Sequence, residues 1–249
     1  MANSAWMLGY AEQAVRISDA AHAHARRRRH PFHLGWVLTM GAGVFDFLRE
    51  PDELLKRAEE ANRVGRENSL PFVTQCLVPI SSGIALIRRG QVAERMASLA
   101  KGLAVWEEGG GQVHAPYFKS ALAEGMTQRG NLAGALDLID EAIAQVERPG
   151  SEERWYYAET LRIKGWLLSL KGDPEGAERS YLASLDWART QQAKSWELRT
   201  ATSSARLMRD QGRAREARDL LAPIYHWFTE GFATKDLKDA KALLDELVA

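Results

Sequence analysis

Glycines at predicted turns recur along this chain at a nearly constant interval. Gly90, Gly130, Gly172 and Gly212 are 40, 42 and 40 residues apart, and Gly9 lies 81 residues before the first of them. Small residues flank these turns at fixed distances. Seven residues before a turn lie Gly83, Ala123, Gly165 and Ala205. Five residues after a turn lie Ala14, Ala135, Ala177 and Ala217, and only Arg95, after the Gly90 turn, breaks this second series. A fixed period with matched small residues predicts an array of helical hairpins whose backbones approach closely.

The stretch 161–187 shows the repeating unit most clearly. Gly172 can adopt the left-handed conformation that ends a helix, Asp173 is a good N-cap, and Pro174 suits the first position of the next helix. Gly165 before the turn and Ala177 after it are the small residues expected where the two helices touch. The stretch therefore predicts a helix, a tight turn and a second helix.

Carried along the chain, this unit predicts a single all-α domain over residues 1–249, a right-handed α-α superhelix of about six helical hairpins. The unit without a turn glycine should turn at residues 49–52. The predicted units cover residues 1–30, 31–69, 70–111, 112–150, 151–193 and 194–232. A last amphipathic helix is expected over 234–248, capped by Thr234, with one apolar face for stacking and one polar face for water. Pro79 and Pro223 lie inside predicted helices and should kink or break them.

Residues 1–8 are predicted to form the end of a helix whose beginning is absent, so the chain is expected to start part-way through a repeat. Two interpretations stay open: this half-repeat caps the array, or the sequence is a piece of a longer protein. An uncapped end exposes apolar surface. Self-association into a homo-oligomer through the N-terminal end is therefore one expectation.

Composition excludes several classes of protein. Basic and acidic residues balance, 33 of each, so the chain has no global preference for nucleic acid or anionic lipid. The single cysteine, Cys76, lies among apolar neighbours and is interpreted as a small buried hydrophobe. No apolar run approaches the ~20 residues of a membrane span, and no signal-peptide pattern opens the sequence. We therefore expect a cytoplasmic protein without a membrane partner.

Two local motifs each have a functional and a structural interpretation. The basic run at residues 22–30 could mark nucleic acid, but cations are also favourable at a helix C-terminus. One such run without interleaved aromatic residues rarely makes a nucleic-acid site. The glycines at 109–111 lack the Lys-Ser/Thr pair of a phosphate loop and follow no predicted strand. We interpret the first motif as a helix end and the second as a plain loop.

The hairpins resemble tetratricopeptide repeats (TPRs), in a form lengthened to about 40 residues from the usual ~34. Armadillo and HEAT repeats have a closer period but lack the small residues that flank this turn. The resemblance covers nearly the whole chain and implies a helical-repeat fold.

Four C-terminal segments carry a narrower resemblance: Ser195–Arg199, Arg209–Arg213, Ala217–Pro223 and Trp227–Phe232. They look like the repeat region that ends large bacterial signalling proteins, in which a nucleotidyl cyclase or DNA-binding domain precedes a P-loop ATPase module. The resemblance implies a sensor or scaffold that works with an ATPase or adenylate cyclase module in the same protein or on another chain.

In such an array the first helix of each hairpin lines the inner surface. Inward positions of the early units are apolar: Val37, Met40, Val44, Phe47, Leu77, Ile80, Ile84 and Ile87. In the later units the predicted partner-binding residues are polar, basic or aromatic: Tyr117, Glu124, Glu159, Arg162, Trp166, Arg199, Arg206 and Arg209. The apolar half is either core or an interaction surface. The basic half could bind an acidic peptide, because Arg side chains match carboxylates.

Nothing in the sequence assembles a catalytic constellation. Carboxylates lie beside Lys and Arg in the manner of solvated helices, and no nucleophile motif joins Ser, His and Asp. We therefore predict a protein that is not an enzyme, needs no cofactor or metal, and binds a protein or peptide segment in its inner groove, in bacterial signalling or transcription control. Nucleic acid is disfavoured as a partner. A self-assembling scaffold, a small-effector sensor and, less favoured, an enzyme with an atypical site inside the superhelix stay open.

Overall fold

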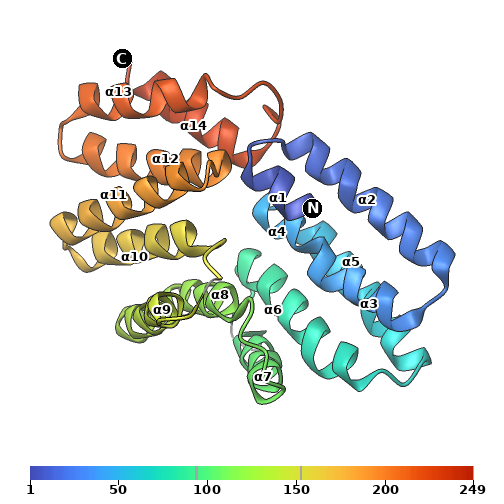
Figure 1. The fold of residues 1–249 in the computed structure, drawn as a ribbon. Coiled ribbons are helices and arrows are strands. Elements are labelled where there is room, and N and C mark those ends of the chain that lie inside the picture. The colour runs from blue at the N-terminus through green and yellow to red at the C-terminus, as the bar shows by residue number, and fades with distance from the viewer. Residues whose placement is uncertain (93–94, 152, 249) are drawn as a thin grey trace. The chain divides into compact units, whose positions relative to one another are not determined.

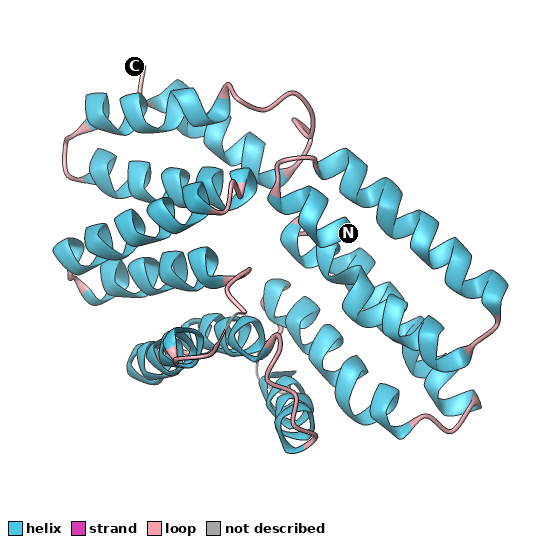
Figure 2. Ribbon diagram, viewed as in Figure 1, coloured by secondary structure: helices cyan, strands magenta, loops and turns pink. Residues whose placement is uncertain are grey.

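The computed structural model describes residues 1–92, 95–151 and 153–248, and these residues form helices and loops without a strand (Figure 1 and Figure 2). The all-α prediction is therefore confirmed for the described residues. By the packing of their backbones the residues separate into two compact units. The first contains residues 1–4 and 13–131, and the second contains residues 5–12 and 132–249. The short helix α1, Ala2–Met7, and the helix α2, Ala11–Arg28, each have residues in both units.

The first unit continues from α2 through a series of helices that pack on their neighbours. Their bounds are α3 Pro31–Thr39, η1 Met40–Ala42, α4 Gly43–Phe47, α5 Pro51–Glu67, η2 Val73–Leu77, α6 Val78–Arg88, α7 Arg95–Glu108 and α8 Ala115–Gln128. Helix α5 packs on α3, α4 and α6, and α6 packs on α7 and α8. Fully buried apolar side chains, among them Leu38, Phe47 and Phe118, form the core of this unit.

The second unit consists of residues 5–12 and the C-terminal helices. Their bounds are α9 Leu132–Glu147, α10 Tyr157–Lys171, α11 Pro174–Thr190, α12 Lys194–Asp210, α13 Ala214–Tyr225 and α14 Lys235–Glu246. Helix α10 packs on α9, α11 and α12, and α12 packs on α11 and α13. Helix α14 contacts both α12 and α13 and buries Leu237, Leu243 and Leu244 against them. The predicted last helix thus covers an apolar face. Thr234 occupies its N-cap position, but its side chain makes no cap hydrogen bond, so this part of the prediction is wrong.

The turns follow the predicted glycine pattern. All five predicted turn glycines have positive φ angles: Gly9 100°, Gly90 77°, Gly130 78°, Gly172 83° and Gly212 78°. This left-handed conformation strains any residue with a Cβ atom. The unit without a turn glycine places Arg49 in the same conformation, with φ 59°. The N-cap prediction for Asp173 is also confirmed, because its Oδ1 accepts a hydrogen bond of 2.8 Å from the Gly176 N–H.

The small residues beside the turns lie where two helices approach closely. A Cβ atom on Gly165 of α10 would lie 2.6 Å from the Tyr181 ring and 3.1 Å from the Ala177 carbonyl oxygen on α11. A Cβ atom on Gly83 of α6 would lie 2.7 Å from Cβ of Leu99 on α7. Real Cβ atoms do not approach this closely. The predicted contact of helix backbones at these positions is therefore confirmed.

Two helices differ from the expected continuous form. The helix expected over 33–48 is divided into α3, the 3-10 turn η1 and α4. Gly41 and Gly43 lie at this division, and each costs about 0.5–1 kcal/mol relative to Ala inside a helix. A kink or break is expected at Pro79; a π-helical stretch, η2, leads directly into α6 without a non-helical residue, and Pro79 lies in the first turn of α6. Pro223 lies inside α13, which ends two residues later at Tyr225.

None of the described helices combines the length and the apolar character that crossing a bilayer requires.

Candidate functional site

The eight predicted partner-binding residues divide between the two units. The first unit holds Tyr117 and Glu124, both on α8. The second unit holds the other six, on the neighbouring helices α10 and α12: Glu159, Arg162, Trp166, Arg199, Arg206 and Arg209. The prediction that all eight line one groove stays a prediction.

In the first unit a buried ionic cluster surrounds Asp46 of α4. The Tyr117 hydroxyl donates a hydrogen bond of 2.8 Å to Asp46 Oδ2, and Arg88 Nε donates one of 2.8 Å to Asp46 Oδ1. Arg88 also forms an ion pair with Glu124. The Tyr117 ring packs edge-on against Phe47, with centroids 5.7 Å apart. Tyr117 therefore stabilises the buried Asp46 carboxylate and exposes little surface to a partner, and Glu124 shares Arg88 with Asp46.

In the second unit Glu159 is the buried centre of a similar cluster. Arg162 Nε lies 2.7 Å from Glu159 Oε2, and Arg162 Nη2 lies 2.9 Å from Oε1. Arg199 Nη1 reaches the same carboxylate at 3.1 Å from α12. The other edge of the Arg199 guanidinium binds Asp236 of α14, with Nη2–Oδ2 at 2.5 Å. Two arginines and two carboxylates thus neutralise one another inside this unit.

Aromatic rings enclose the Arg199 guanidinium. Its central carbon lies 5.1 Å from the Trp6 ring centroid and 5.0 Å from that of Trp196, distances typical of cation–π contacts. Burial by itself would lower the pKa of Arg199, but the carboxylates of Asp236 and Glu159 outweigh burial and raise the pKa. Arg199 is therefore a permanent buried cation.

The remaining predicted residues lie nearer to solvent. Trp166 is half-buried on α10, and Arg206 is exposed on α12. Arg206 lies 3.9 Å from Asp239, and Arg209 lies 2.6 Å from Glu246, so both arginines face acidic residues of α14. The predicted basic stripe of α12 is thus largely paired with carboxylates of the same unit. Trp166 and Arg206 are the members best placed to meet a partner.

Sequence reasoning named Glu124 and Glu159 but missed that they pair with arginines, and it did not name Asp46 or Asp236, although the spacing was readable. Arg88 contacts Asp46, 42 residues earlier, and Glu124, 36 residues later. Arg199 contacts Glu159, 40 residues earlier, and Asp236, 37 residues later. Both arginines therefore pair with acids placed about one repeat length before and after them. The repeat period could have predicted these pairs.

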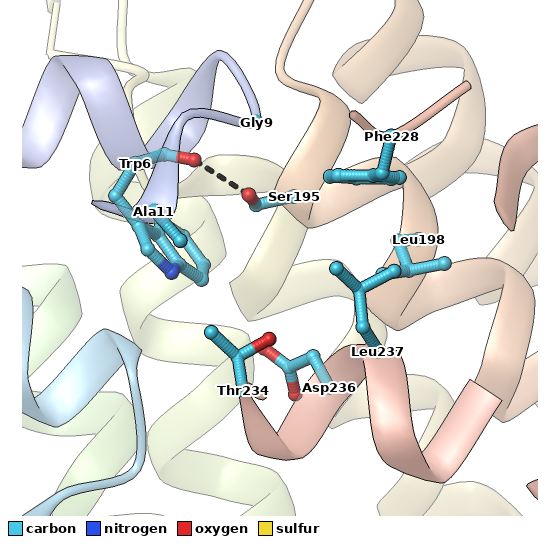
Figure 3. Close-up of a pocket in the computed structure, with 9 residues that line it drawn as sticks. All are labelled: Trp6, Gly9, Ala11, Ser195, Leu198, Phe228, Thr234, Asp236 and Leu237. Atoms are coloured by element: carbon cyan, nitrogen blue, oxygen red, sulfur yellow. Dashed lines mark hydrogen bonds between the residues drawn. The ribbon is translucent and has the colours of Figure 1, made fainter. Parts of the chain in front are cut away.

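A small pocket of the second unit lies beside Trp6 (Figure 3). Its free volume is about 10 Å³, close to the minimum that one water molecule needs. It is lined by Trp6, Gly9, Ala11, Ser195, Leu198, Phe228, Thr234, Asp236 and Leu237. Trp6 and Ala11 lie on one side of it, and Leu198, Phe228 and Leu237 lie on the other (Figure 3). The pocket has no room for a small organic ligand beside Trp6.

The first unit carries exposed aromatic side chains that the sequence analysis did not single out. Phe32 and Trp36 are exposed on α3. The Phe32 ring stacks on Phe72, with centroids 6.3 Å apart, and Phe72 stacks in turn on Trp106 at 6.1 Å.

The interpretation of the basic run as a helix end is confirmed, because Arg26, Arg27 and Arg28 form the last turn of α2.

The only cysteine of the sequence, Cys76, is a candidate reactive group. Cys76 is fully buried, and burial raises the pKa of its thiol to about 11, so it remains a neutral thiol at neutral pH. The interpretation of Cys76 as a small buried hydrophobe is confirmed. Within the described part of the chain, no three His, Cys, Asp or Glu side chains are grouped closely enough to hold a metal ion.

No protein-family model matches the chain, and no curated protein matches its sequence. Solved structures do match its fold. One is PlcR from Bacillus thuringiensis, in a crystal structure in complex with the peptide PapR7 and DNA. The match has a TM-score of 0.65 and 13% sequence identity, and it covers 86% of this chain and 74% of PlcR. The chain thus shares the TPR-like fold of PlcR, and the predicted fold class is confirmed.

Proposed function

We propose that this chain is a non-catalytic module that binds a protein or peptide segment and serves bacterial signalling or transcription control. The observation that carries the proposal is the helical-repeat fold, which is shared over most of both chains with PlcR in complex with a peptide and DNA. Helical repeats expose extended surfaces that such segments use. An ATPase or cyclase module, in the same protein or in another, would supply the output.

The proposed contact surface is the face of α10 and α12 that carries Trp166 and Arg206. Aromatic and arginine side chains contribute most of the energy in many interfaces. Glu159 and Arg162 precede Trp166 on α10, Arg199 precedes Arg206 on α12, and these three residues form a buried ionic cluster. Their role is to hold the two helices in register, and they are not expected to contact the partner directly. A small-effector sensor is less favoured, because the pocket beside Trp6 has room for about one water molecule.

Binding to an array of synthetic peptides tests the proposal. The wild-type chain is expected to retain a subset of peptides, and Trp166→Ala and Arg206→Glu should each weaken that binding by about tenfold or more. Arg215→Glu is the matched control, since Arg215 is 95% exposed on α13. If both substitutions leave every peptide bound as tightly as the control does, the α10–α12 face is not the binding surface.

A further inference from the structure

Residues 5–12, which we call the strap, pack against the other end of the chain within the second unit. The strap contacts α12, the loop 226–234 and the beginning of α14. The hydrogen bond from Ser195 Oγ to the Trp6 carbonyl oxygen, 2.5 Å long, joins residues 189 positions apart (Figure 3). The strap is therefore a short segment held on a helical surface that is distant in sequence.

Trp6 is the anchor of the strap. Its side chain is 2% exposed, and its ring meets Trp196 edge-on, with centroids 4.5 Å apart. The Arg199 guanidinium lies 5.1 Å from the same ring. The α12 surface thus presents an aromatic wall and a fixed cation to one indole ring, which is an arrangement that selects tryptophan.

Gly9 and Glu12 give the strap two further contacts. A Cβ atom on Gly9 would lie 2.5 Å from the Trp227 ring, and the φ angle of Gly9 is +100°, so a side chain is excluded at this position. The Glu12 N–H donates to Glu230 Oε1 at 2.9 Å, and the Gly231 N–H donates to Glu12 Oε1 at 3.2 Å. Trp6, Gly9 and Glu12 are spaced three residues apart.

Two of the side chains between these contacts reach solvent, whereas Ala11 is buried beside the pocket and the Tyr10 ring centroid lies 6.2 Å from that of Trp227. Leu8 is 43% exposed and Tyr10 is 37% exposed. A segment that buries one large anchor, fits a glycine against an aromatic ring and keeps only part of its other side chains in water is held in the manner of a bound peptide.

We propose that the surface formed by α12, the loop 226–234 and the start of α14 is a peptide-binding site, which the chain's own strap occupies. The ligand class is a segment with Trp, then Gly three residues later, then an acidic residue three residues after that. Because the pocket beside Trp6 holds about one water, a partner segment must displace the strap to bind. This inference rests on the proposed function and specifies a second surface for it, separate from Trp166 and Arg206.

The test uses the full chain with Trp6→Ala and a fluorescent synthetic peptide of residues 1–12. A tethered segment acts at an effective concentration of about 1 mM, so the wild-type site is occupied and should bind little peptide. The Trp6→Ala chain should bind it saturably, on the order of tenfold tighter or more than the wild type. A peptide that itself carries Trp6→Ala should not bind, and one with Leu8→Ala should bind normally, because Leu8 is 43% exposed.

Failure of the folded Trp6→Ala chain to bind the wild-type peptide would overturn the inference. If Trp6→Ala does not fold, hydrogen exchange of the wild-type chain decides the question. Peptide in excess of the effective concentration should speed exchange of the strap amides, and unchanged exchange contradicts the site. If the strap peptide does not bind, but binding to the peptide array is still weakened by Trp166→Ala, this inference fails and the proposed function stands.

Discussion

Arg199 is a residue whose neighbours could be predicted in part. The repeat period places Glu159 one unit before it, and both residues belong to the predicted partner-binding set. Their burial was not predictable, because the cover comes from Trp6 and Asp236, whose proximity no local pattern encodes. Side chains expected to face a partner are instead paired with each other.

Replacing Arg199 should therefore affect stability first. Arg199→Ala leaves the Glu159 and Asp236 carboxylates without their shared cation, and breaking a buried pair typically costs about 3–5 kcal/mol. Urea unfolding followed by circular dichroism measures this loss. Arg215→Ala, at a 95% exposed position, should change the free energy of unfolding by less than about 0.5 kcal/mol. Equal effects of the two substitutions would show that the cluster contributes no stability.

His22 provides a pH-dependent contact between α2 and α5. Its Nδ1 accepts a hydrogen bond of 2.6 Å from Arg57 Nη1, which requires the neutral imidazole. Burial lowers the pKa of His22 below 6.5, and Arg57 and Arg26 lower it further, while Glu60 and Asp19 oppose them. Protonation thus costs more in the folded chain than in the unfolded one.

The sign of the pH effect follows from this lowered pKa. The stabilising contribution is complete above pH 6.5, the unfolded value, and is lost as the pH falls from there through the folded pKa. His22→Gln should remove this part of the pH dependence, which thermal unfolding at a series of pH values would measure. A His22→Gln profile parallel to the wild type contradicts the assignment.

At the scale of the helices, the glycine pattern predicted most of what the structure contains. This pattern predicted the turns and the two helices of each hairpin. It also predicted the close contacts at Gly83 and Gly165. The pattern did not predict the division of α3 from α4, because the spacing of the hairpins carries no information about a local 3-10 turn at Gly41.

Gly165 should resist even the smallest substitution. Gly165→Ala places a Cβ atom 2.6 Å from the Tyr181 ring and 3.1 Å from the Ala177 carbonyl oxygen. Overpacking of this kind costs about 1–3 kcal/mol, more than the ~1 kcal/mol that Ala gains over Gly in helix propensity. Chemical denaturation of Gly165→Ala, Tyr181→Leu and the double variant measures the coupling. The double variant should lose less than the two single losses combined, and strict additivity would rule out the contact.

At the scale of the whole chain, sequence reasoning identified the repeat fold but did not predict that residues 5–12 pack on the C-terminal helices. A repeat pattern describes only contacts between successive units, and the contact of residues 5–12 with α12 and α14 has a separation of up to about 230 residues. The N-terminal end, which was expected to be uncapped, therefore packs through Trp6 on Trp196 of the same chain. Homo-oligomerisation through this end stays a prediction.

Because the chain divides into two units, a destabilising substitution is expected to affect mainly the unit that contains it. Repeat proteins sum local stabilities, and regions open in separate cooperative steps. Arg88 stabilises Asp46 and Glu124 in the first unit, and Arg199 stabilises Glu159 and Asp236 in the second. Each arginine can therefore be removed as a local perturbation of one unit.

Hydrogen exchange with mass spectrometry should resolve these two perturbations along the chain. Arg88→Ala is expected to speed amide exchange in α4, α6 and α8 and to leave α10 to α13 close to wild type. Arg199→Ala should speed exchange in α10, α12, α14 and residues 5–12, because Trp6 packs on the Arg199 guanidinium. Arg215→Ala sets the background for a surface change. If either arginine variant accelerates exchange equally in both units, the chain opens as one cooperative body and the division has no energetic meaning.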